Sequence, residues 1–413
     1  MSDQSAIVIV GAGEAGTAAA FALREGGWRG IAVLIGNETM LPYERPPLSK
    51  ATLTDEMNPG PKQIVTSERL VELGIDYLQG SEVVSIDRAV NMVRLSNGSG
   101  IAYHRLLLAT GARPRKLSVP IAEGAKVATL RTYDDATRIR HVIGQGRDVV
   151  VIGGGFIGLE VAASAVSRGA SVVVLEAGSR LLMRAVPLPM AELIRAKHEC
   201  SGVRIETSAI VERIDFSEGR SNVVLTGGRT YEADLVIVGI GATPNVELAQ
   251  AAGLAVDNGI VLDETLATSD PHVFAAGDCC SFPHCLYEKR VRLEAWRNAQ
   301  RQGAAAAANM LGENRPYVDV PWFWSDQYDE TLQIVGLCPE GETPVVRRLG
   351  ARGQILFYLG TDGRLVAACG FGSLGLVARE IRFAEIMISR RLSPKVEALA
   401  DPAMNMKKLL GLG

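Results

Sequence analysis

The chain has 413 residues, enough for about three domains of ordinary size, so a small single module is excluded. Hydrophobic residues make up 47% of the chain and charged residues 22%, a composition typical of folded globular proteins and unlike that of disordered or collagen-like chains. The formal net charge of -3 gives no reason to expect nucleic acid as a partner.

The start of the chain has neither the basic nor the apolar region of a secretory signal, and the apolar runs have the length of strands. We therefore expect a cytoplasmic protein. Six cysteines are too few for a disulfide scaffold, and none forms a CxxC pair. The five histidines form no metal-ligand cluster in the sequence, so no metal is expected.

The same pattern of strand, glycine turn and helix occurs twice. Residues 6–10 form an apolar, largely β-branched run, GAGEAG follows directly, and an Ala-rich helix is predicted up to Gly26. The order returns with DVVVIG (148–153) and the turn GGGFIG (153–158). One such fingerprint is weak, but two in the required context predict two dinucleotide sites. The fingerprint glycines are Gly11, Gly13 and Gly16, then Gly153, Gly155 and Gly158.

A second element is also repeated, because residues 106–114 (LLLATGARP) and 236–244 (VIVGIGATP) both follow a hairpin-like stretch. Past residue 320 the pattern changes to that of an antiparallel sheet, closed by a helix near 375–391. These observations predict an α/β protein with two Rossmann-like dinucleotide-binding domains and a C-terminal α+β domain.

An acidic residue ends the strand after the second fingerprint, where a carboxylate accepts hydrogen bonds from an adenosine ribose. This residue, Glu176, favours NADH because a carboxylate repels the 2′-phosphate of NADPH. The alternative is a glutamate that merely ends a strand in water. After the first fingerprint, Asn37 and Glu38 occupy the corresponding place.

The whole chain resembles the FAD-dependent NADH:ferredoxin reductases that serve Rieske-type aromatic-ring dioxygenases and bacterial haem monooxygenases. PPLSK and PWFWSDQ are more specific for this family than either glycine fingerprint. The motifs that carry the resemblance are GAGEAG, LPYERPPLSK (41–50), LLLATGARPR, LRTYDDA (130–136), VVIGGGFIGLEVAA, DLVIVGIGATPN, TSDPHVFAAGDC (268–279), VRLEAWRNAQRQG (291–303) and PWFWSDQY (321–328).

The resemblance implies a glutathione-reductase-like architecture with an FAD-binding domain (1–113 and 242–320), an NADH-binding domain (114–241) and a C-terminal domain (321–413). It implies FAD contacts, besides the first glycines, at Ala15, Asn37, Glu38, Lys50, Val83, Ala109, Thr110, Gly111, Arg131, Asp278, Glu294 and Trp296. The implied NADH contacts, besides the second glycines, are Ile157, Glu160, Glu176, Arg184 and Gly239. The family usually has Asp at position 37, and Asn here still donates and accepts hydrogen bonds.

Three of these residues are candidates for the chemistry. Lys50 would supply positive charge beside the flavin and pair with Glu160, which would lie near the nicotinamide amide. Trp296 would cover the flavin ring. Without the motifs, the same residues would be a loop lysine, a glutamate favoured by the helix dipole and a packing tryptophan.

Two further features leave alternatives open. Trp322 and Trp324 alternate along one predicted strand, so both rings share a face and either line the electron route or pack the third domain. The neighbouring Cys279 and Cys280 have either a redox role or plain burial. The chain lacks the CxxxxC pair of disulfide reductases near residues 38–60.

Two segments, 287–301 and 379–408, are richer in Lys and Arg than in acidic residues. Ferredoxins are usually acidic, so these segments are a docking hypothesis, with a solvated face or internal ion pairs as the alternative. The candidate docking residues are Arg290, Arg297, Arg301, Arg390 and Arg391.

The sequence therefore predicts a reductase that moves hydride from NADH to FAD and single electrons to a two-iron ferredoxin feeding an oxygenase. One alternative is an NADH-dependent reductase or oxidase of a small acceptor such as a quinone, a radical or oxygen. The other is a flavoprotein that senses NADH and signals through dimerisation. The sequence does not identify the ferredoxin, the oxygenase or its substrate.

Overall fold

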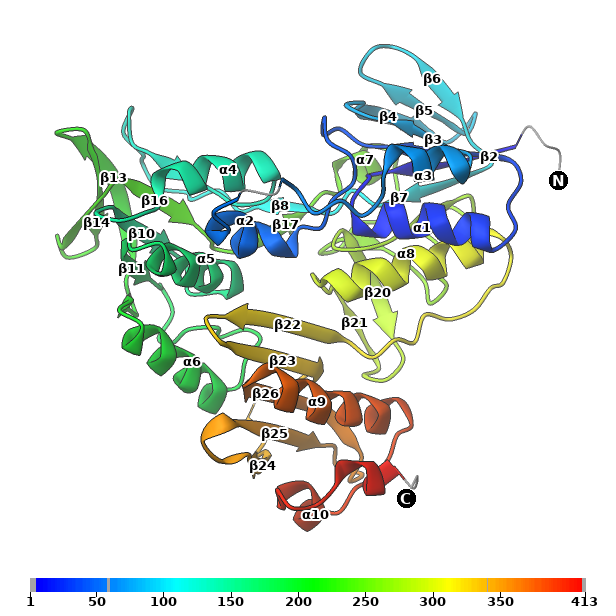
Figure 1. Cartoon of the computed structure of the whole chain (residues 1–413). Helices are drawn as coiled ribbons and strands as arrows, with labels where there is room; N and C mark the ends of the chain where they lie inside the picture. Colours follow the sequence, from blue (N-terminus) through cyan, green and yellow to red (C-terminus); the bar gives the residue numbers. More distant parts are fainter. Residues whose placement is uncertain (1–4, 58–59, 340, 411–413) are drawn as a thin grey trace. The chain divides into compact units, whose positions relative to one another are not determined.

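The computed structural model describes residues 5–57, 60–339 and 341–410 (Figure 1). Contacts between Cα atoms divide the chain into two compact units. Unit 1 comprises Met1–Glu44, Pro61–Arg113 and Ala242–Asp319; unit 2 comprises Arg45–Gly60, Pro114–Gly241 and Val320–Gly413. The sequence-based boundaries assigned residues 45–60 to the FAD-binding domain, whereas these contacts group them with unit 2.

Unit 1 is built on a five-stranded parallel sheet of strand order β19-β7-β1-β2-β3. These strands are β1 (Ala6–Val10), β2 (Ile31–Ile35), β3 (Ile75–Leu78), β7 (Arg105–Leu108) and β19 (Val273–Ala275). Their Val, Ile, Leu and Ala side chains are almost all buried, as expected for parallel strands covered on both faces. They form the core of this unit together with α1.

Helix α8 (Trp296–Met310) lies along α1 (Glu14–Glu25), as Figure 1 shows. The close approach depends on Gly303, because a methyl group there would lie 2.1 Å from the carbonyl oxygen of Ala15. The other helices of the unit are α3 (Ser67–Glu72) and α7 (Glu247–Ala251). Smaller sheets are formed by β4 (Val83–Asp87), β5 (Met92–Leu95) and β6 (Gly100–Ala102), by β8 (Ala112–Pro114) and β17 (Ala242–Pro244), and by β18 (Ile260–Val261), β20 (Cys280–His284) and β21 (Lys289–Val291).

The nucleotide-binding part of unit 2 repeats this plan with the strand order β12-β11-β10-β16-β9. Its parallel strands are β9 (Val127–Ala128), β10 (Asp148–Ile152), β11 (Ser171–Leu175), β12 (Arg204–Glu206) and β16 (Leu235–Val238). The meander of β13 (Val211–Ser217), β14 (Arg220–Leu225) and β15 (Thr230–Ala233) corresponds to β4-β5-β6. The duplication predicted from the two fingerprints is therefore confirmed at the level of topology.

The helices of this part are α4 (Tyr133–Val142), α5 (Phe156–Ser167) and α6 (Leu188–Cys200). The short helices η1 (Pro46–Ser49) and α2 (Ala51–Thr54) pack against α4 and α5. Arginine side chains hold this segment: Arg140 donates to the carbonyl oxygens of Thr52 and Leu53, and Arg168 donates to Leu53 at 2.7 Å. These bonds explain why residues 45–60 group with unit 2.

The C-terminal domain is an antiparallel sheet of order β22-β23-β26-β25-β24, with α9 packed on it. The strands are β22 (Trp322–Gln327), β23 (Glu330–Gly336), β24 (Val345–Arg348), β25 (Gly353–Leu359) and β26 (Leu365–Gly372), followed by α9 (Leu374–Ser389), α10 (Val396–Ala400) and η3 (Met406–Leu410), with η2 (Gly350–Arg352) between β24 and β25. The predicted antiparallel sheet and closing helix are confirmed. No helix among the described residues has the length and apolar character needed to cross a membrane.

A buried ion pair holds the end of the chain on this sheet. Arg347 Nε lies 3.0 Å from Glu380 Oε2, and both side chains are only 2% exposed. The Arg347 guanidinium also donates to the carbonyl oxygens of Leu399, Asp401 and Met404, on the segment around α10. One buried cation therefore ties β24, α9 and the C-terminal segment together.

Removing either charge should cost much more than removing a surface pair. We expect R347M and E380L each to lower the free energy of unfolding by about 3–5 kcal/mol, because each leaves a buried charge without its buried partner and Glu380 then keeps only the exposed Arg379, while the double variant should lose less than the sum. Urea unfolding measures the loss. The exposed pair Arg204–Glu206 provides the control, since R204M should change stability by less than about 1 kcal/mol. Equal losses in R347M and R204M would contradict this assignment.

Candidate functional site

The two glycine turns have the same shape. A methyl group at Gly11 would lie 2.1 Å from the Ala109 carbonyl oxygen, and one at Gly16 would lie 1.9 Å from that of Gly11. At Gly13, by contrast, it would meet no atom of the described residues within 4 Å. The outer glycines are therefore required for packing, and the middle one leaves the backbone open in front of α1.

The second turn repeats this pattern of two crowded glycines and an open one between them. A methyl group at Gly153 would lie 2.5 Å from the Gly239 carbonyl oxygen, and one at Gly158 would lie 2.1 Å from that of Gly153. Gly155 is open, since its nearest neighbour would be 3.9 Å away. Each turn thus leads directly into a helix N-terminus, which is what a dinucleotide pyrophosphate requires. The residues fit FAD at the first turn and NADH at the second.

Unit 1 carries Gly11, Gly13, Ala15, Gly16, Asn37, Glu38, Val83, Ala109, Thr110, Gly111, Asp278, Glu294 and Trp296, and unit 2 carries Lys50 and Arg131. The predicted NADH residues Gly153, Gly155, Ile157, Gly158, Glu160, Glu176, Arg184 and Gly239 all lie in unit 2.

Glu176 holds the second glycine turn from the end of β11. Its Oε2 accepts a hydrogen bond from Gly154 N at 2.6 Å, and its Oε1 accepts one from Gly178 N at 2.7 Å. A carboxylate has about four lone-pair sites, so oxygen capacity remains for the hydroxyls of a ribose. Ile157, in the first turn of α5, is 45% exposed and Arg184 is exposed. The Arg180 guanidinium, in contrast, donates hydrogen bonds to carbonyl oxygens of its own loop.

On the first turn, Asn37 is exposed beyond β2, and the neighbouring Glu38 accepts a hydrogen bond from the Tyr43 hydroxyl. Thr110 and Asn245 exchange two hydrogen bonds, of 2.6 and 2.8 Å, that fix the loop after β7. Gly277 N donates to the buried Gln302 side chain at 2.9 Å, which orients the backbone just before Asp278.

Glu14, beside the first glycine turn, is a residue that the sequence reasoning did not single out. Its carboxyl stands in the first turn of α1 and accepts a hydrogen bond from Gln300 Nε2 at 3.1 Å. Burial, aided by the charge of Glu44, raises the pKa of Glu14 to about 7. A partly protonated carboxyl lowers the negative charge beside the first glycine turn.

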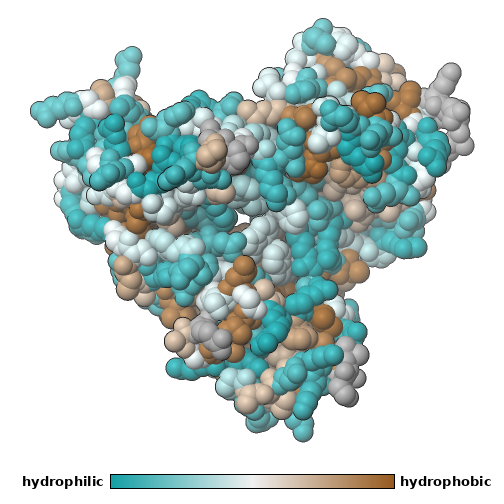
Figure 2. Space-filling view, viewed as in Figure 1, coloured by the Kyte–Doolittle hydropathy of each residue, from teal (hydrophilic) through white to brown (hydrophobic). Residues whose placement is uncertain are grey.

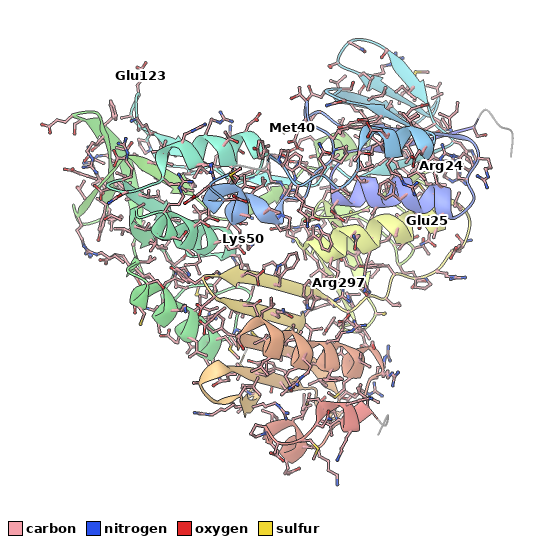
Figure 3. All side chains as sticks on the ribbon, in the orientation of Figure 1. Arg24, Glu25, Met40, Lys50, Glu123 and Arg297 are labelled. Atoms are coloured by element: carbon pink, nitrogen blue, oxygen red, sulfur yellow. The ribbon has the colours of Figure 1, made fainter. Side chains whose placement is uncertain are left out.

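The predicted pair of Lys50 and Glu160 is present. Lys50, labelled in Figure 3 at the start of α2, places Nζ 2.7 Å from Glu160 Oε2. Lys50 is 23% exposed and Glu160 only 4%, although Glu160 stands in the second turn of α5. The sequence did not reveal the other groups on this carboxylate: Ser49 donates to Oε2 at 2.5 Å, and Ser325 donates to Oε1 at 2.6 Å.

The aromatic residues of β22 alternate as predicted. The Trp322 and Trp324 rings stack with centroids 5.1 Å apart and an interplanar angle of 22°. Phe323 points to the other face and contacts Phe156 of α5 at 4.2 Å between centroids. Ser325 and Gln327 share the face of Phe323, which explains how a strand of the C-terminal sheet reaches Glu160.

All six cysteines are free thiols. The Sγ atoms of Cys279 and Cys280 lie 3.7 Å apart, and both residues are fully buried. The hydrogen bond from Cys280 lowers the pKa of the Cys279 thiol, whereas burial raises that of Cys280. Neither sulfur is accessible to an outside acceptor.

The candidate docking residues differ in their hydrogen bonds and in their exposure. Arg290 donates to the carbonyl oxygens of Leu262 and Ser281, and Arg301 pairs with Asp319. These two therefore match the internal-pair alternative. Arg390 and Arg391, at the end of α9, are exposed. Figure 3 labels Arg297, in the first turn of α8.

Residues 5–303 match the family model of pyridine nucleotide-disulphide oxidoreductases, and residues 322–410 match the reductase C-terminal model. The chain belongs to this family. It is 41% identical over 404 residues to the anthranilate 1,2-dioxygenase system ferredoxin–NAD(+) reductase component of Burkholderia cepacia, covering 98% of each chain. It is also 41% identical over 342 residues to a rubredoxin–NAD(+) reductase of Pseudomonas putida, covering 83% of this chain and 89% of the relative.

A solved structure gives the same result for the fold. The reductase of a covalent putidaredoxin reductase–putidaredoxin complex superposes with a TM-score of 0.92 at 37% identity and 99% coverage of both chains. The family resemblance inferred from the sequence motifs is thereby confirmed, together with FAD and NADH as cofactors.

Proposed function

We propose that this protein takes hydride from NADH onto FAD and passes single electrons to a two-iron ferredoxin that feeds an oxygenase. The observation that carries the proposal is the buried pair of Lys50 and Glu160 beside the second glycine turn. A bound flavin supplies the conversion between two-electron and one-electron transfer. The named relatives of dioxygenase and putidaredoxin systems support a ferredoxin as acceptor.

The residues around Glu160 fit a site that holds an amide rather than one that hydrolyses a bond. The carboxylate pairs with Lys50 and accepts hydrogen bonds from two serines, so it presents a fixed acceptor near the start of α5. We assign it to the nicotinamide amide N–H groups. Lys50 neutralises part of this charge.

The acceptor is a separate protein in this proposal, as the named relatives suggest. The neighbouring Cys279 and Cys280 are both buried, which argues against a disulfide relay at this pair. We place the reaction in the cytoplasm, where NADH is regenerated by metabolism. The oxygenase is either a Rieske-type aromatic-ring enzyme or a haem monooxygenase.

Stopped-flow spectroscopy tests the function. NADH should bleach the flavin of the holoenzyme within milliseconds to seconds, and a two-iron ferredoxin should then reoxidise it in one-electron steps. Rubredoxin, oxygen and a small quinone are the comparison acceptors. Faster reoxidation by any of these than by ferredoxin would mean that this acceptor, and not ferredoxin, is the electron acceptor of the enzyme.

Glu176 provides a test of coenzyme choice. We expect E176Q to lower the preference for NADH over NADPH at least tenfold, because the repulsion of the 2′-phosphate disappears while the amide still holds Gly154 or Gly178. The ratio of kcat/KM values with ferricyanide measures the change. The control E206Q changes a carboxylate on the neighbouring strand β12 and should leave the ratio unaltered, and an unaltered ratio in E176Q would remove Glu176 from the ribose site.

The exposed arginines at the end of α9 test the docking surface. Figure 2 shows hydrophilic side chains interspersed with apolar ones over the C-terminal domain. Reversing both charges in R390E/R391E should raise the KM for ferredoxin about tenfold at low salt and leave ferricyanide reduction unchanged. The control R29E/R94E makes the same charge change at exposed sites of unit 1. Equal effects of both double variants would mean that net charge, not this surface, attracts ferredoxin.

A further inference from the structure

We propose that a hydrogen-bond chain running from Tyr328 to Glu160 positions the Glu160 carboxylate. The inference rests on the proposed function, in which Glu160 binds the nicotinamide amide. We call this the Tyr328 chain; its members, in order, are Tyr328, His198, Gln327, Ser325 and Glu160. The four residues before Glu160 act as positioning residues.

The inner half of the chain lies on β22. Ser325 Oγ is 2.6 Å from Glu160 Oε1, and Gln327 Nε2 is 3.0 Å from Ser325 Oγ. The outer half connects to α6, where His198 Nε2 lies 2.7 Å from Gln327 Oε1. The Tyr328 hydroxyl lies 3.0 Å from the other ring nitrogen, Nδ1. His198 is 0% exposed, and Ser325 and Gln327 are also buried, so water does not compete for the three inner bonds; the bond from Tyr328 is part-buried.

The direction of every hydrogen bond follows from the carboxylate. An ionised carboxylate only accepts, so Ser325 donates to Glu160 and uses its oxygen to accept from the Gln327 amide. The Gln327 carbonyl then accepts from His198, which must carry its proton on Nε2. The remaining nitrogen, Nδ1, accepts from the Tyr328 hydroxyl. All four donors therefore point toward Glu160, and each bond polarises the next.

The outer groups are held in the required protonation states. Burial lowers the pKa of His198, so the ring is neutral and Nδ1 stays an acceptor. Burial also raises the pKa of Tyr328 to about 12, so the hydroxyl keeps its proton. Both groups are neutral, and the chain adds no charge that would compete with Lys50.

The charged groups nearby are paired among themselves. Lys197, beside His198 on α6, lies 2.5 Å from Asp329 and 3.8 Å from Glu330 at the β22–β23 turn, and Cys200 lies near Lys197. Strand β26, which packs on α6, contributes only Cys369 as a titratable residue. Asp326 lies on the opposite face of β22 from Ser325. On the Glu160 side, Lys50 is the cation that faces the carboxylate.

The backbone at Tyr328 supports a functional reason for this side chain. Tyr328 has φ of 58°, the left-handed region that favours Gly or Asn over a bulky aromatic residue. The ring meets His198 edge-on, with centroids 5.1 Å apart, and Lys197 Nζ lies 5.9 Å from its centroid. A tyrosine thus occupies a strained turn position where its hydroxyl completes the chain.

Infrared titration of the holoenzyme tests the inference. In S325A, Glu160 loses one hydrogen bond to its ionised form, so the midpoint of its carboxylic acid band should rise by about one to two pH units. The same band, absent in E160Q, identifies Glu160. Tyr328→Phe should give a smaller shift in the same direction. The control T331V removes a buried hydroxyl of the adjacent strand β23 that has no hydrogen-bond partner among the described residues, and should give no shift.

Two further readouts separate positioning from plain packing. Nitrogen-15 NMR of the five histidines, assigned with H198Q, should show His198 protonated at Nε2 in the native protein and mixed tautomers in Q327L. The rate of flavin reduction by NADH in S325A should fall at low pH with the same midpoint as the infrared band.

An unshifted band in S325A, or a His198 protonated on Nδ1 in the native protein, would overturn the inference. If S325A were to unfold, Y328F and the native tautomer still decide the question. A shifted band in a protein that fails to reduce ferredoxin would uphold the chain and refute the proposed function instead.

Discussion

The buried charge of Glu160 is the constraint on which the site in unit 2 depends. A carboxylate that is 4% exposed is stable only with opposite charge and donors around it, because its desolvation costs several kcal/mol. Lys50 supplies the opposite charge and Ser49 a hydrogen-bond donor, both from the segment before α2. Ser325 supplies a second donor from β22. One acidic residue on α5 therefore requires two distant parts of the chain to fold against the nucleotide-binding sheet.

The two glycine turns show how much of the fold could be predicted from local sequence. Gly11 and Gly153 are needed because any side chain there would clash with a carbonyl oxygen. Such short-range steric requirements can be recognised from the sequence alone. The duplicated topology and the alternation of Trp322 and Trp324 follow from equally local periods. The closing helix was expected at 375–391 and lies at Leu374–Ser389.

The parts of the site that escaped prediction depend on long-range contacts. His198 is a single histidine on a helix, and nothing in its neighbourhood along the sequence reveals that it faces Gln327. Ser49, Ser325 and Gln327 all stood inside motifs that carried the family resemblance, yet a motif does not state which side chains meet. The contacts of Glu14 could not be predicted for a similar reason, because its hydrogen bond to Gln300 joins α1 to α8.

The grouping of residues 45–60 with unit 2 has a consequence for protein engineering. This segment is anchored by Arg140, Arg168 and Ser164, all outside it and all on the nucleotide-binding helices. A chimaera that exchanges the NADH-binding domain with that of a relative by cutting only at residues 114 and 241 would separate Lys50 from the helix that carries Glu160. A functional chimaera must therefore exchange residues 45–60 together with residues 114–241, although residues 61–113 of unit 1 lie between them in the sequence.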